Sequence, residues 1–110
     1  MKIRFLIYLI DSERAYFRGR LSLEVDEKLT DEDYERMRKE FIRVGETCIK
    51  KHYRNQQAQH MDIRFLGERF LSQSEVFIYD YYVRGKKVSI IYRHIGPIVY
   101  WLSKILAPFI

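Results

Sequence analysis

The sequence lacks the features that mark disulfide-rich secreted proteins and structural metal sites. Its single cysteine, Cys48, has no partner for a disulfide within the chain, which is typical of a reducing compartment. No CxxC motif and no second pair of metal-ligand residues accompanies it. We therefore expect no metal, no cofactor and a cytoplasmic location, in the host cell if the protein is viral.

Motifs of common catalysts are also missing. The only Gly-Lys pair, Gly85-Lys86, lacks the upstream glycine of a phosphate-binding loop. Cys48 and His52 are four residues apart, so a helix would bring them to one face as a nucleophilic pair or half a metal site. A buried core thiol and a solvated cation at a helix end explain the same two residues. We expect that the chain is not an enzyme.

Apolar runs are too short to cross a membrane. The first one, KIRFLIYLI, is interrupted by Arg4 and followed by acidic residues without a small-residue cleavage site, so it does not read as a signal peptide. The C-terminal IVYWLSKILAPFI is almost entirely apolar, but a span needs about 20 residues. No membrane span is predicted.

The remaining composition fits one globular domain over residues 1–110. Hydrophobic residues make up 47% of the chain and charged residues 32%, far from a disordered composition. The net charge of +5 is spread over both halves, without a basic tail. A moderate positive charge is compatible with a nucleic acid or with an acidic protein as a partner, and it does not distinguish between the two.

Hydrophobic periodicity predicts the elements in the order ββαβββα. Alternation predicts strands over 3–9 and 15–25, with a bulge at Gly19. Thr30 followed by three acidic residues predicts an N-cap and a helix over 31–54. The second half predicts a strand over 61–65, a loop over 67–74, a hairpin of 75–83 with 87–94 that turns at Gly85, and a last helix from Pro97.

These elements predict an α+β fold with two layers. Five mostly antiparallel strands would form one sheet, and both helices would cover one of its faces. The covered face would hold Ile3, Phe5, Ile7, Phe17, Leu21, Leu23, Ile63 and Phe65. The other face would be wet and would show Arg4, Tyr8, Tyr16, Arg18, Arg20, Arg64 and part of the second hairpin.

The second hairpin, VFIYDYYVRGKKVSIIY, is rich in tyrosine. Alternation sends Tyr79 and Tyr81 to one face and Tyr82 to the other, so packing under the helices cannot absorb every ring. Tyrosine offers a large contact area and a polar end, which enriches it in protein interfaces. A central strand with two buried faces is the alternative.

The stretch DYYVRGKKV (80–88) resembles a hairpin of small anti-CRISPR proteins from archaeal rod-shaped viruses, the type I-D inhibitors. An acidic-capped helix precedes the strands in both. The resemblance covers about a tenth of the chain. It implies a compact helix-on-sheet protein that dimerises and blocks a CRISPR effector subunit without chemistry. The net positive charge departs from the acidic family pattern.

The sequence thus favours a small non-catalytic protein-binding module, an inhibitor of a host defence complex. The alternative is a single-stranded nucleic-acid binder that uses the arginine and tyrosine residues of the wet sheet face. The predicted partner-binding residues are Arg4, Tyr16, Arg18, Arg20, Tyr79, Tyr82, Arg84, Lys86 and Lys87. A last helix that is apolar on all sides predicts a homodimer, with Trp101, Ile105 and Phe109 at its interface.

Overall fold

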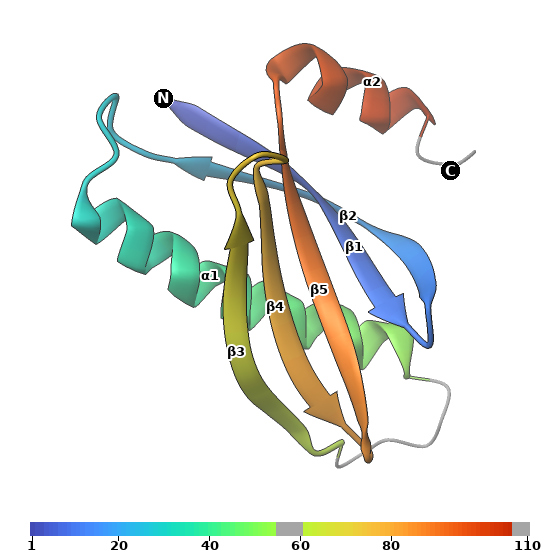
Figure 1. Cartoon of the computed structure of the whole chain (residues 1–110). Coiled ribbons are helices and arrows are strands. Elements are labelled where there is room, and N and C mark those ends of the chain that lie inside the picture. The colour runs from blue at the N-terminus through green and yellow to red at the C-terminus, as the bar shows by residue number, and fades with distance from the viewer. Residues whose placement is uncertain (55–60, 107–110) are drawn as a thin grey trace.

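The computed structural model describes residues 1–54 and 61–106, and it confirms the predicted order of elements (Figure 1). All five strands pair antiparallel in one sheet of order β2-β1-β5-β4-β3. The elements are β1 (Lys2–Asp11), β2 (Arg14–Glu24), α1 (Asp31–His52), β3 (Ile63–Leu71), β4 (Val76–Val83), β5 (Lys86–Ile95) and α2 (Pro97–Leu106).

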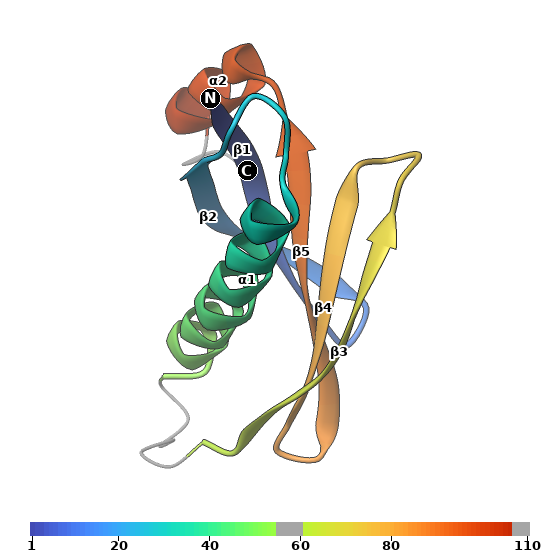
Figure 2. The same cartoon turned by 90° about the vertical axis from the view of Figure 1, so that its left-hand side faces the viewer.

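The hydrophobic core lies between α1 and one face of the sheet (Figure 2). Phe41 of α1 is at its centre, edge-to-face with Phe5 of β1 at 5.0 Å and stacked on Tyr92 of β5 at 4.2 Å between ring centroids. Such aromatic pairs stabilise a core beyond the area that they bury. The residues facing α1 include Phe5, Ile7, Leu9, Tyr79, Tyr81, Val83, Val88, Ile90 and Tyr92.

Most rings of the tyrosine-rich hairpin belong to this core. Tyr79, Tyr81 and Tyr92 are all almost completely buried. The Tyr81 hydroxyl donates to the backbone carbonyl of Ile42 at 2.9 Å, and the Tyr92 hydroxyl donates to that of Phe41 at 2.5 Å. A buried hydroxyl needs such a partner. Tyrosine therefore serves here as a core residue whose polar end binds the backbone of α1.

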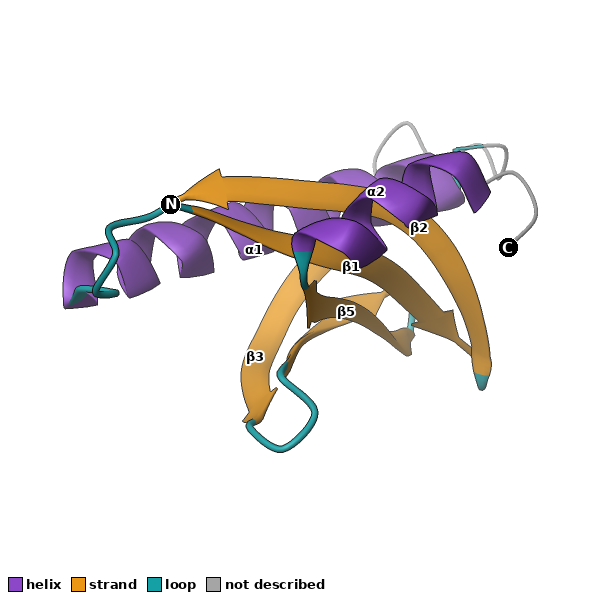
Figure 3. Cartoon of the chain, turned by 90° about the horizontal axis from the view of Figure 1, so that it is seen from above, coloured by secondary structure: helices purple, strands orange, loops and turns teal. Residues whose placement is uncertain are grey.

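The second helix differs from the prediction that both helices cover one face. Phe5 faces α1, so the alternate residues Arg4 and Leu6 face the other way. The guanidinium of Arg4 lies over the ring of Tyr100 in α2, and Arg20, which pairs with Leu6, donates to the carbonyl of Ser103 in α2. Hence α2 packs on the face opposite α1, with β1 and β2 between the two helices (Figure 3).

A β-bulge in β2 corrects the predicted faces of three residues. Ile7 pairs with Gly19 and Tyr8 pairs with Phe17, which leaves Arg18 as the extra residue. Past the bulge the alternation is reversed. Phe17 therefore lies on the face opposite α1, beside Tyr8, whereas Tyr16 lies on the α1 side, against the ring of His52. Arg18 lies over the Tyr16 ring, on that same side.

A second bulge corrects the predicted loop over 67–74. Phe65 pairs with Tyr81 and Gly67 pairs with Asp80, so Leu66 is the unpaired residue and the strand continues to Leu71. The apolar alternation breaks at this point, and β3 is an edge strand with one exposed side. The alternation of apolar and polar residues therefore could not predict that the strand continues through residues 67–71.

The turn between β4 and β5 confirms the expected positive φ at Gly85. Val83 pairs with Lys86 across a two-residue turn in which Arg84 has φ +50° and Gly85 has φ +85°. Two residues with positive φ are what a type I′ hairpin turn requires.

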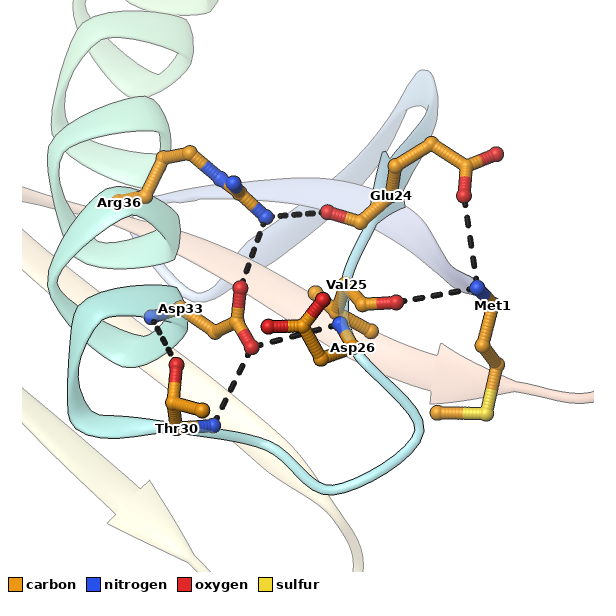
Figure 4. Close-up of polar contacts among 7 residues, drawn as sticks. All are labelled: Met1, Glu24, Val25, Asp26, Thr30, Asp33 and Arg36. Atoms are coloured by element: carbon orange, nitrogen blue, oxygen red, sulfur yellow. Dashed lines mark hydrogen bonds and ion pairs between the residues drawn. The ribbon is translucent and has the colours of Figure 1, made fainter.

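The N-terminus of α1 is fixed by a capping box, as its sequence indicates (Figure 4). The backbone N–H of Asp33 donates to the Thr30 hydroxyl at 3.1 Å, and the Asp33 carboxylate accepts from the backbone N–H groups of Thr30 and Asp26. The guanidinium of Arg36 donates to the same carboxylate and to the carbonyl of Glu24. Asp33 therefore joins the end of β2 to the start of the helix.

These contacts predict a pH-dependent stability. The backbone hydrogen bond from Thr30 is the main cause that holds the pKa of Asp33 below its usual value; burial opposes it, and the Thr30 side chain, the Asp26 backbone and the charge of Arg36 add to it. The carboxyl group of Asp33 therefore binds a proton more readily in the unfolded chain than in the folded one. The stability that its contacts provide is complete above pH about 4 and is lost as the pH falls through the lowered pKa. Urea unfolding should show that Asp33→Asn lowers the free energy of unfolding at pH 7, and that this loss is smaller at pH 3. Asp31→Asn, an exposed change in the same turn, should show a smaller pH-dependent difference, and equal pH profiles for the two variants would refute the assignment.

Candidate binding surfaces

The outer side of α2 forms an exposed apolar surface. The helix contacts the sheet through Tyr100 and the buried Ser103, whose carbonyl accepts from Arg20. Six other side chains of α2 are apolar and 42% to 74% exposed, and we call them the apolar helix surface: Ile98, Val99, Trp101, Leu102, Ile105 and Leu106. Trp101 and Ile105 are thus exposed as expected, while Phe109 lies outside the described residues.

A second surface is the part of the sheet that faces away from α1 and is not covered by α2. Tyr81 faces the core, so its neighbours in β4, Asp80 and Tyr82, face outward. Pairing then places further residues of β3 and β5 on the same face. We call this surface the open sheet face, and its polar and aromatic members are Arg64, Arg69, Asp80, Tyr82, Lys87, Ser89 and Arg93.

The open sheet face continues onto β1 and β2. Tyr8 and Phe17 meet there in a T-shaped contact with 5.7 Å between ring centroids. The guanidinium of Arg20 lies over the Phe17 ring, so Arg20 belongs to this face as predicted, next to α2. Arg4 lies on the same side of the sheet but in the part that α2 covers, with its guanidinium over the ring of Tyr100.

Asp80 is the only carboxylate on this face among the described residues of β3, β4 and β5. It is largely buried, and it accepts from the guanidinium of Arg69 at 3.2 and 3.3 Å and from the hydroxyl of Ser89 at 2.6 Å. The ammonium group of Lys87 lies 4.0 Å away. The negative charge of Asp80 is thus balanced by its neighbours, and the outer part of the face keeps a net positive charge.

The structure separates the partner-binding residues that the sequence grouped together. Tyr82 is 40% exposed, whereas Tyr79 is in the core and cannot present its ring to a partner in this fold. Arg84 stands at the hairpin turn, and Lys86 forms an ion pair with Asp11 at 2.8 Å. Tyr16 and Arg18 lie on the α1 side of the sheet because of the bulge.

A polar cluster around Asp11 joins the end of β1, the start of β5 and the C-terminal end of α1. Its carboxylate accepts from Lys86 of β5 and from the Tyr53 hydroxyl at the end of α1, and His52 Nε2 lies 3.9 Å away. Partial burial opposes ionisation, but the hydrogen bonds from Lys86, Tyr53 and Ser12 hold the pKa of Asp11 below its usual value. Burial, with the nearby charge of Arg18, lowers the pKa of His52. These contacts connect the end of β1, the start of β5 and the end of α1.

The thiol of Cys48 is a core group. Burial raises its pKa, which keeps the thiol protonated and poorly nucleophilic. His52 is held between the rings of Tyr16 and Tyr53, at 4.7 Å from each. Within residues 1–54 and 61–106, no three His, Cys, Asp or Glu side chains gather as metal ligands would. No helix in this part of the chain has the length and hydropathy to cross a membrane.

An apolar hollow of about 380 Å³ opens between the start of α1 and the β3–β4 turn. Its rim carries His94 and Glu75, whose Nδ1 and carboxylate oxygen are 3.3 Å apart. The other lining residues are Ile3, Leu29, Tyr34, Met37, Phe70 and Phe77. Most of the wall is apolar, and it carries few groups that could orient a small-molecule ligand.

Arg69 and Arg93 on the open sheet face were missed by sequence reasoning. Arg69 lies in the stretch predicted as a loop, and Arg93 lies at the end of a strand predicted only as part of the tyrosine hairpin. The alternation of β5 from the buried Tyr92 could have placed Arg93 on this face.

Comparisons of the chain with protein-family models, with curated proteins and with solved structures find no match.

Proposed function

We propose that the chain is a small non-catalytic protein-binding module that associates through the apolar helix surface. The exposure of this surface carries the proposal. A helix in a small domain usually turns its apolar side chains inward, and a contiguous exposed apolar surface usually marks an interaction site. In α2 the side chain turned most fully inward is a serine, whereas tryptophan, leucine and isoleucine side chains point outward.

The first partner that we propose is a second copy of the chain. Two-fold dimers are the commonest oligomers of soluble proteins, and in them the same patch of both chains meets and is covered. Trp101 and Ile105 are four residues apart, so they share one side of α2 and would lie near that axis. The apolar helix surface carries no acidic residue, and Lys104 is the only charged residue of α2. Pairing of two such helices therefore buries little charge.

This predicts a dimer in solution. Light scattering should give about twice the 13.5 kDa of one chain, and Ile105→Glu or Trp101→Arg should give monomers, because each would bury a charge in an apolar contact. Leu66→Glu is the matched control: its side chain is 49% exposed, close to the 52% of Ile105, but it lies at the bulge of β3. The control should stay dimeric. A clean monomer of the unmutated protein at high micromolar concentration would overturn the proposal.

We further propose that the module inhibits a host defence complex by occupying one of its surfaces. The support is the resemblance of DYYVRGKKV to the hairpin of small anti-CRISPR proteins, together with the exposure of Tyr82, Arg84 and Lys87 on that hairpin. A pull-down from nuclease-treated host lysate tests this. A CRISPR-type effector subunit should be retained by the unmutated protein and lost with Tyr82→Ala, and retention of no defence protein would contradict the proposal.

A further inference from the structure

We propose that the open sheet face is a binding site for single-stranded nucleic acid. This inference does not depend on dimer formation, since α2 packs on β1 and β2, beside the part of the face that β3, β4 and β5 form. It rests on three observations: the charge of the face, the aromatic rings that it presents, and the cations and hydroxyl that balance the carboxylate of Asp80.

The charge comes from basic side chains of three adjacent strands. Arg64 of β3 and Arg93 of β5 are exposed, and Lys87 of β5 is 59% exposed in its side chain. The side chain of Arg69 is 55% exposed even though it bonds Asp80. Lys87 and Arg93 lie near opposite ends of β5, about 20 Å apart by strand geometry. A polyanion that runs along β5 can therefore meet several cations at once.

Aromatic rings accompany these cations. Tyr82 is 40% exposed between its pairing partners Arg64 of β3 and Lys87 of β5, and the guanidinium of Arg64 lies 5.4 Å from its ring centroid. Tyr8 and Phe17 form a second, partly exposed pair farther along the same face. Bases stack on such rings and on guanidinium planes, and cations beside them meet the phosphates. This combination distinguishes the face from a merely solvated surface.

The ring-and-cation pattern favours nucleic acid over an acidic protein. An acidic peptide needs the cations but gains little from rings spread over separate strands. A duplex hides the flat faces of its bases, so Tyr82, Tyr8 and Phe17 would have nothing to stack on. A single strand uses both kinds of side chain. Lys104, whose ammonium lies over the Tyr100 ring, adds a further cation where α2 borders the face.

Fluorescence anisotropy with labelled oligothymidylate and oligouridylate tests the inference. If about four cations each meet a phosphate, log affinity should fall with log salt with a slope of about −3. Lys87→Ala with Arg93→Ala should weaken binding at least tenfold at low salt and reduce the slope to about half. Tyr82→Ala should weaken binding about tenfold with an unchanged slope, because it removes stacking and no charge.

The matched control is Lys39→Ala with Lys50→Ala, which removes the same charge from the exposed side of α1. It should bind within about twofold of the unmutated protein, and thermal melting should confirm that all variants fold. Three results would each overturn the inference: no oligonucleotide binding at 50 mM salt, equal weakening by the control, or competition by polyglutamate or duplex DNA as strong as by the single strand. All of these variants keep the natural sequence of α2, so the outcomes do not depend on whether the dimer forms.

Discussion

Phe41→Ala is expected to lower the free energy of unfolding by about 3–5 kcal/mol. The Phe41 ring is 1% exposed and contacts Phe5, Phe77, Tyr79 and Tyr92, with centroid distances of 4.2 to 5.5 Å. Truncation leaves a cavity between α1 and the sheet that neighbouring rings cannot fill without leaving their rotamers. A domain of this size is stable by only about 5–15 kcal/mol, so much of its stability would be lost.

Chemical denaturation monitored by circular dichroism measures this effect. Phe41→Leu keeps most of the volume and should cost less than about 1.5 kcal/mol. Tyr34→Ala is the control on the same helix, since its side chain is 49% exposed, and it should cost much less than Phe41→Ala. A loss below about 1 kcal/mol for Phe41→Ala would contradict the docking of α1 through this ring.

The second large effect is expected at Gly45, in the middle of α1. A methyl group there would lie 2.3 Å from the hydroxyl oxygen and 2.9 Å from the Cζ atom of Tyr81, a ring that is completely buried. Gly45→Ala should gain about 1 kcal/mol of helix propensity. It should lose more through overpacking, about 1–3 kcal/mol, and through displacement of the Tyr81 hydroxyl from the carbonyl of Ile42. We expect a net loss of about 2 kcal/mol.

A double-mutant cycle with Tyr81→Phe tests the cause. Removing the hydroxyl relieves the closest contact but leaves Cζ, so Gly45→Ala should cost about 1 kcal/mol less in that background than in the unmutated protein. Lys39→Gly, at an exposed position of the same helix, measures what a glycine costs where its Cβ has space. If Gly45→Ala stabilises the protein, the Tyr81 ring is not packed against the helix as described.

Local signals account for what the sequence could predict. The cap at Thr30, the turn at Gly85 and the start of the last helix at Pro97 each depend on a few adjacent residues, and each is confirmed. The order of strands and helices follows from these boundaries. The exposure of Trp101 and Ile105 also follows from local pattern, because a short helix that is apolar on all sides cannot bury every side chain.

Tertiary contacts account for what the sequence could not predict. The bulges at Arg18 and Leu66 each shift the alternation of apolar residues by one position. The first exchanges the faces of Tyr16 and Phe17, and the second makes residues 67–71 of β3 look like a loop in the sequence. The side of the sheet taken by α2 depends on Arg20 and Arg4, whose partners are distant in sequence. One signal was available: a glycine in a helix interior, such as Gly45, indicates a close approach by another element.

The pairing of β1 with β5 sets the order in which the chain can fold. The β1–β2 hairpin and the β3–β4–β5 meander each form from neighbouring segments, but the sheet is joined only when Arg4 meets Ile95 and Ile10 meets Ser89. Closing so long a loop costs conformational entropy before any contact repays it, which slows folding. During synthesis, β1 leaves the ribosome before β5 and keeps one edge unpaired until β5 follows. The β1–β2 hairpin is therefore exposed to aggregation and to chaperones in the nascent chain.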